Sequence, residues 1–140
     1  MKYFTISELE HSDIAERLLI DNSIPDHLLQ NAECLIDFLS DLRDAWGSAI
    51  IVNSGYRCDY LNNKVGGSNT SAHRYALAAD IIPSNGNMKK FQQFIKEWIK
   101  DKDFDQLILE KPINGIASWI HVGLRQPNTD AYRKQIFTIL

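Results

Sequence analysis

One long apolar stripe constrains the fold more than any other feature of this 140-residue chain. Between Leu28 and Trp46, apolar residues recur every three or four positions, which is the spacing of one face of an α-helix. Ser23 and Pro25 precede the stripe and are typical of a helix start, and Gly47 stands where a glycine commonly ends a helix. The pattern predicts a helix of about five turns, whose apolar face must pack against other elements.

Short apolar runs supply the partner for that helix. Ala49–Asn53 and Ala78–Pro83 are predicted to be buried strands, and Phe104–Glu110 and Trp119–Leu124 are predicted to form a hairpin. We also expect short helices in the first twenty residues, a second long helix and an edge strand, the last two over Asn87–Lys100 and Arg133–Leu140. This order predicts a single α+β domain, residues 1–140, with helices packed on one face of a small antiparallel sheet.

Charge and hydropathy exclude several classes of protein. Fifteen basic residues against eighteen acidic ones give a net charge of −3, and no Lys/Arg cluster could build a basic face, so we expect no nucleic-acid partner. The longest purely apolar runs have four residues, so no membrane insertion is expected. The first residues carry acidic side chains where a signal peptide needs an apolar core, so we expect synthesis in the cytoplasm without a secretory signal. Cys34 and Cys58 are expected to be free thiols rather than a disulfide.

A polar stretch from Ser54 to His73 lies between the first two predicted strands, and long stretches without periodicity are more often functional than idle. Asp80 follows as the only charged residue of Ala76–Pro83, and His121 is the lone polar residue of another apolar run. Two imidazoles and a carboxylate are a common ligand set of catalytic zinc. Each residue alone has another interpretation, because a strand histidine is often a hydrogen-bonded core residue and a strand aspartate often pairs with a backbone group or an arginine. Residue types alone leave both interpretations open.

Several short motifs occur in a defined order: Ser54-Gly55-Tyr56-Arg57, Leu61-Asn62, Val65-Gly66-Gly67-Ser68, Ser71-Ala72-His73, then Ala76, Ala78 and Asp80, and finally Trp119-Ile120-His121-Val122. Together they resemble the zinc D-alanyl-D-alanine carboxypeptidase or murein peptidase family, which shares its fold with the hedgehog signalling domain. The N-terminal residues resemble the small single-domain branch of bacteria and their phages, on the strength of Tyr3-Phe4-Thr5, Glu8-Leu9 and Ser12. The resemblance runs from about residue 3 to residue 124.

The resemblance implies a role for each matching residue. His73, Asp80 and His121 would be the ligands of a zinc cofactor. Arg57 would face the substrate carbonyl or its terminal carboxylate, a task suited to the guanidinium fork, although a structural ion pair is its other interpretation. Ser71 would hydrogen-bond within the site or to substrate, or else only stabilise the loop.

Two positions depart from the family pattern. Ala76 stands where the family usually has glycine, three residues after the first ligand, which is a mild change unless the backbone there needs a positive φ. Ser118 stands three residues before the last histidine, where many members carry a glutamate or histidine. A serine hydroxyl cannot accept a proton near neutral pH, so the general base must come from elsewhere.

Glu110 is the best substitute for that base. If Glu110 pairs with Trp119 in the hairpin, Ile108 lies opposite His121, and Glu110 and His121 project to the same face as near neighbours. A register shifted by one residue would separate them. The small single-domain branch also carries a glutamate at this strand end, and the other interpretation is a carboxylate that faces solvent.

The resemblance implies a zinc-dependent metallopeptidase that hydrolyses D-amino-acid-containing bonds of peptidoglycan stem peptides, as a carboxypeptidase or an endopeptidase. Its catalytic residues would be Glu110 and Arg57, and its substrate-binding residues Arg57 and Ser71. We expect a monomer whose partners are stem peptides. A phage or prophage lytic enzyme, released to the cell wall through a membrane lesion or carried by a virion, fits a chain without an export signal. The alternative is a binding or structural module that keeps the fold and the metal without turnover.

Overall fold

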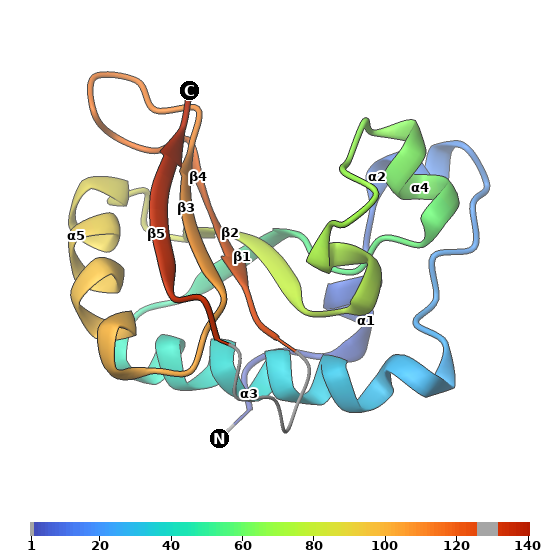
Figure 1. Ribbon diagram of the computed structural model, residues 1–140, viewed down its shortest axis with the longest axis horizontal. Helices are drawn as coiled ribbons and strands as arrows, with labels where there is room; N and C mark the ends of the chain where they lie inside the picture. The colour runs from blue at the N-terminus through green and yellow to red at the C-terminus, as the bar shows by residue number, and fades with distance from the viewer. Residues whose placement is uncertain (1, 126–131) are drawn as a thin grey trace.

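A five-stranded sheet forms the centre of the molecule (Figure 1), in a computed structural model that describes residues 2–125 and 132–140. The spatial order of its strands is β1-β2-β4-β3-β5, with bounds β1 Ile50–Ser54, β2 Ala78–Pro83, β3 Gln106–Glu110, β4 Trp119–Gly123 and β5 Gln135–Ile139. The neighbours β1–β2, β2–β4 and β4–β3 are antiparallel. The α+β class predicted from the sequence is confirmed.

The sheet is mixed, which corrects the expectation that all its strands are antiparallel. β5 pairs in parallel with β3, with Gln135 opposite Gln106. On the other side of β3, Gly123 at the end of β4 also pairs with Gln106. β4 therefore ends, and β5 begins, beside the first residue of β3. Because β5 and β3 begin at the same end of the sheet, they run parallel.

Two long helices cover one face of the sheet. α3 (Leu29–Trp46) is the helix predicted by the apolar stripe; a 3-10 turn, η1 (Asp26–Leu28), leads into it, and Gly47 ends it with a φ of 80°. α5 (Met88–Trp98) packs against α3 and β2 and continues into η3 (Ile99–Asp101). The buried faces of both helices share one core with side chains of the central strands, among them Ala79, Ile81, Leu107, Leu109, Ile120 and Val122.

Shorter helices fill the N-terminus and the polar stretch. α1 (Ile6–Glu10) and α2 (Asp13–Arg17) each begin at a side chain that accepts a backbone hydrogen bond, Thr5 and Ser12. α4 (Asp59–Lys64) and η2 (Ala72–Tyr75) lie between β1 and β2 in the chain. Figure 1 shows α2 and α4 grouped at one end of the molecule and α5 at the other.

Strand alternation gives the sheet two different faces. On β4, Ile120 and Val122 are fully buried in the core beneath the helices, so Trp119 and His121 project to the opposite face. The face without the long helices is therefore the one that presents the candidate site residues of β4.

Cys34 and Cys58 are both free thiols, as predicted. Within residues 2–125 and 132–140, no helix combines the length and the apolar character that crossing a bilayer requires.

Candidate metal centre and catalytic cleft

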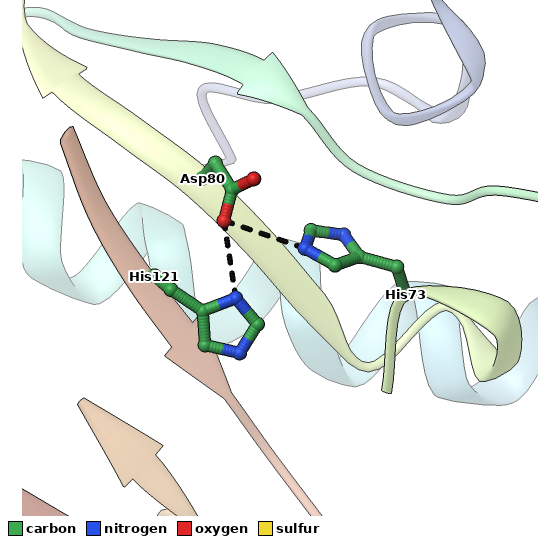
Figure 2. A group of neighbouring side chains, drawn as sticks. All are labelled: His73, Asp80 and His121. Atoms are coloured by element: carbon green, nitrogen blue, oxygen red, sulfur yellow. Dashed lines mark hydrogen bonds and ion pairs between the residues drawn. The ribbon is translucent and has the colours of Figure 1, made fainter. Parts of the chain in front are cut away.

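Three buried side chains from three different elements meet on this face (Figure 2): His73 of η2, Asp80 of β2 and His121 of β4. Asp80 and His121 are brought together by strand pairing, because they are direct partners in the β2–β4 register. The Asp80 Oδ1 atom lies 3.0 Å from Nδ1 of His121 and 3.3 Å from Nε2 of His73. The structure therefore groups the three residues that the sequence comparison singled out.

The geometry of this trio fits a zinc ion. A tetrahedral zinc with bonds of about 2.0–2.1 Å holds its ligand atoms about 3.3 Å apart, and the observed separations from Asp80 Oδ1 are close to that value. The three candidate ligand atoms all lie within 4.8 Å of one another. Two imidazoles and one carboxylate leave a fourth position for water or substrate, as catalytic zinc sites require.

His73 is held in a defined orientation by the backbone of the preceding turn. Its Nδ1 atom donates a hydrogen bond of 2.6 Å to the carbonyl oxygen of Gly55, which leaves Nε2 as the ligand atom. Burial is the largest influence on this imidazole and lowers the pKa of His73, although Asp80 opposes the shift. The ring is therefore neutral at neutral pH, which is the state that binds a metal.

Gly55 is a glycine because the chain passes very close to α1 there. A Cβ at this position would lie 2.6 Å from the carbonyl oxygen of Leu9, and the next residue, Tyr56, donates its N–H to the same oxygen at 2.7 Å. One residue further, the N–H of Arg57 bonds to the carbonyl of His73 at 3.0 Å. The Ser-Gly-Tyr-Arg turn thus links α1 to the first candidate ligand.

Asp80 stays ionised although it is buried. Burial raises its pKa, but the contacts with the imidazoles of His121 and His73 outweigh burial and hold the pKa well below its usual range. Its second oxygen, Oδ2, lies 3.5 Å from Nη2 of Arg57. A buried carboxylate that keeps its charge is a suitable ligand for a divalent cation.

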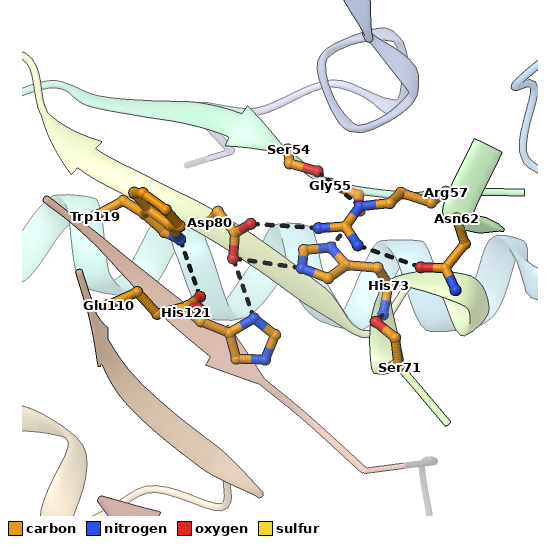
Figure 3. Close-up of polar contacts among 10 residues, drawn as sticks. All are labelled: Ser54, Gly55, Arg57, Asn62, Ser71, His73, Asp80, Glu110, Trp119 and His121. Carbon is orange, nitrogen blue, oxygen red and sulfur yellow. Dashed lines mark hydrogen bonds and ion pairs between the residues drawn. The ribbon is translucent and has the colours of Figure 1, made fainter. Parts of the chain in front are cut away.

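Arg57 is fixed from several sides (Figure 3). Its Nε donates to Oγ of Ser54 and its Nη1 to Oδ1 of Asn62, both at 3.2 Å. Gly67 makes room for this arrangement, because a Cβ there would lie 2.1 Å from Oδ1 of Asn62. Burial lowers the pKa of Arg57, while Asp80 and then Glu110 oppose the shift, and a guanidinium remains charged in any case. Arg57 therefore forms the structural ion pair with Asp80. It also lines a cleft that contains the three candidate ligands.

The predicted hairpin register is confirmed: Glu110 pairs with Trp119 and Ile108 with His121. Trp119 donates its indole N–H to Oε2 of Glu110 at 2.9 Å, so the carboxylate is oriented rather than free in solvent. Ser118 takes no part in the cleft, because its hydroxyl donates to the carbonyl oxygen of Lys111 at 2.6 Å. The carboxylate on the cleft wall next to the candidate ligands is thus that of Glu110.

Ser71 lies at the start of η2, where its Oγ accepts the backbone N–H of His73 at 3.2 Å. This contact supports the loop-stabilising interpretation, and the residue also lines the cleft. The cleft has a volume of about 470 Å³ and includes the three candidate ligands, Arg57, Ser71 and Glu110. All the site residues expected from the sequence therefore share one cavity.

Sequence reasoning assigned no role to two residues that the structure places in the site. Asn62 is buried and joins Arg57 to the carbonyl oxygen of Ser68, and Trp119 orients Glu110. The register that pairs Glu110 with Trp119 already implied the second contact. A second group of possible ligands in the described parts of the chain, His11, Asp13 and Glu16, is exposed and lies outside this cleft.

Comparison with known families agrees with this geometry. A model of the family described as peptidase M15 matches residues 2–123, a span that contains every candidate site residue discussed above. A search of curated proteins finds no match. The match covers most of the chain, and the chain therefore belongs to the peptidase M15 family, whose members are metal-dependent peptidases.

Proposed function

We propose that this protein is a zinc-dependent peptidase that hydrolyses D-amino-acid-containing bonds of peptidoglycan stem peptides. The observation that carries the proposal is one cavity in which a buried His-Asp-His trio, an oriented carboxylate and a fixed guanidinium meet. The M15 family membership supports a metallopeptidase, and the resemblance in the sequence supplies the substrate class. A role in wall lysis by a phage remains a prediction of that resemblance.

The ligands would be Nε2 of His73, Oδ1 of Asp80 and Nδ1 of His121. A zinc ion bound there supplies Lewis acidity, which lowers the pKa of water towards about 7 and polarises a carbonyl oxygen. The bond from His73 Nδ1 to Gly55 keeps that imidazole in the tautomer and orientation that binding needs.

Glu110 is the general base and acid of the proposal. Oε2 is held by the Trp119 indole, so Oε1 takes the proton from the attacking water and later delivers it to the leaving amine. The nearby Arg57 carries the positive charge that stabilises the developing oxyanion or binds the substrate's terminal carboxylate.

The test is cleavage of isolated sacculi and synthetic stem peptides by the zinc-loaded protein, with mass spectrometry of the fragments. We expect about one zinc per chain, and fragment masses that distinguish removal of a terminal D-alanine from cleavage within a cross-link. His73→Ala should lose both the metal and the activity. Glu110→Gln should keep the zinc and lose at least a hundredfold in kcat, as expected for loss of a general base.

A binding or structural module would give a different result. It would hold zinc and bind stem peptides without cleaving any of them, and Glu110→Gln would leave its binding unchanged. Zinc-loaded protein that leaves linear and cross-linked stem peptides intact would therefore overturn the peptidase proposal.

A further inference from the structure

A cluster of two arginines and one aspartate lies at the end of the cleft where β3 begins. The Asp105 carboxylate accepts hydrogen bonds from Nε and Nη2 of Arg133 at 2.8 and 2.6 Å, and from Nε of Arg125 at 2.8 Å. Asp105 is buried, whereas the side chain of Arg133 is 45% exposed. The aspartate is therefore covered by guanidinium groups that reach solvent.

Among the residues that the structure describes, this cluster carries a net positive charge. Burial raises the pKa of Asp105, but the hydrogen bonds from Arg133 and Arg125 outweigh burial and keep it below its usual value, so the carboxylate is ionised. Two guanidinium charges then face one carboxylate charge. On a chain whose net charge is −3, such a local excess of positive charge attracts an anionic group.

Within residues 2–125 and 132–140, Arg133 retains donors for such a group. Asp105 occupies its Nε and one N–H of Nη2, which leaves both N–H groups of Nη1 and the second N–H of Nη2 outside that contact. These groups form the end of the guanidinium fork that binds carboxylates with two parallel hydrogen bonds.

Arg133 lines the same cavity as the candidate metal ligands and Glu110, whereas Arg125 does not. Along β3, Ile108 pairs with His121, and Asp105 lies three residues before Ile108, which corresponds to about 10 Å. Glu110 lies two residues beyond Ile108, toward the opposite end of the cleft. The cleft thus runs from Glu110 past the candidate metal ligands to Arg133. The part of the cleft between the candidate ligands and Arg133 is long enough for about three residues of an extended peptide.

We propose that Arg133 binds a second carboxylate of the substrate, about three residues from the scissile bond, and so selects anionic stem peptides over amidated ones. The inference rests on the proposed peptidase function and specifies its substrate. In a stem peptide, a glutamate linked through its γ-carboxyl offers its α-carboxylate for this contact.

Two synthetic stem pentapeptides test the inference, one with this α-carboxyl free and one with it amidated. For the zinc-loaded wild type we expect a kcat/KM about tenfold higher for the acid, mostly through a lower KM. Arg133→Gln should remove the preference, with kcat/KM for the acid falling to about the value for the amide. Arg125→Gln is the matched control: it removes one charge of the cluster but no donor from the cleft wall, so it should keep at least about half of the preference.

Three results would overturn the role of Arg133: a wild type without preference, a preference retained in Arg133→Gln, or one lost equally in Arg125→Gln. If Arg133→Gln does not fold, Arg133→Lys keeps the charge without the fork and should reduce the preference to between two- and fivefold. A wild type that cleaves neither peptide overturns the peptidase function instead. The acid and amide are then compared by calorimetric binding to that uncleaving wild type, where equal affinity, or no binding, overturns the inference as well.

Discussion

At the scale of single residues, Gly55 connects the packing of α1 to the candidate metal centre. Its carbonyl oxygen orients His73, and its missing side chain lets the backbone approach Leu9. A glycine in a sequence motif is thus explained by a steric requirement on one side and a hydrogen bond on the other. Any side chain at this position must shift the backbone away from Leu9 and so displace the carbonyl that orients the imidazole.

We expect Gly55→Ala to lower the free energy of unfolding by about 2–3 kcal/mol, because the new Cβ meets backbone atoms that cannot move aside. Zinc affinity should also fall by about 10- to 100-fold, the usual result of disturbing the partner of a ligand. Gly86→Ala is the control: its Cβ would have open space, and it should cost only about 1 kcal/mol of backbone strain and no zinc affinity. Chemical unfolding and zinc titration measure both effects, and unchanged zinc affinity in a folded Gly55→Ala would contradict the coupling.

The structure shows whether the backbone at Ala76, where the family usually has glycine, needs a positive φ. The residue adopts a φ of 57° at the end of η2 and is fully buried, so the backbone there does favour glycine. The strain of a left-handed alanine is about 1–2 kcal/mol, and its buried methyl group returns about 0.8 kcal/mol. Alanine is tolerated because the methyl group offsets roughly half of the strain, a balance that the sequence could not reveal without the backbone angle.

At the scale of elements, the sequence patterns predicted those features that neighbouring residues determine, such as strand alternation and hairpin register. The hairpin register followed from alternation, because a slip of one residue would have buried His121 in the core and exposed Ile120. The direction of β5 did not follow, because nothing within Gln135–Ile139 specifies which strand edge it joins. Likewise the contact between Asp105 and Arg133 spans 28 positions and depends on where β5 lies, so it was invisible before the fold was known.

Asp105 also fastens the start of β5 to β3, since its backbone carbonyl accepts the N–H of Gln135 at 3.0 Å while its side chain holds both arginines. We expect Asp105→Asn to lower the free energy of unfolding by about 2 kcal/mol at pH 7, the usual cost of losing hydrogen bonds to a charged group. The folded-state pKa of Asp105 is lowered, so its stabilisation is complete above the unfolded pKa of about 4 and declines as the pH falls further.

Urea unfolding at pH 7 and at pH 3 measures this dependence. The difference between wild type and Asp105→Asn should be smaller at pH 3, because part of the wild-type carboxylate is then protonated. Asp101→Asn, whose side chain is 81% exposed, should change stability by less than about 0.5 kcal/mol at either pH. An equal difference at both pH values would mean that the side chain acts through its shape and not its charge.

At the scale of the whole molecule, the residues that stabilise the fold and the candidate site residues lie on opposite faces of the sheet. The two long helices and the apolar core lie on one face, and the three candidate ligands converge on the other. The core is built from residues that do not depend on a metal, in contrast to small domains that fold only when zinc binds. The candidate metal centre should therefore add to the stability of a fold that already exists.

We accordingly expect the protein to keep its helix and strand content in excess chelator and to unfold cooperatively on heating. Because a metal that binds only the folded state stabilises it by mass action, zinc at about 1,000 times its Kd should add roughly 4 kcal/mol and raise Tm by roughly 10–15 °C. His73→Ala should abolish most of this increase while changing the Tm in chelator much less, since the imidazole hydrogen-bonds to one carbonyl oxygen and only lies beside Asp80. Circular dichroism with and without zinc measures both quantities. Loss of secondary structure in chelator would show that the trio organises the whole sheet, because the ligands come from η2, β2 and β4, and would place the metal among the determinants of the fold.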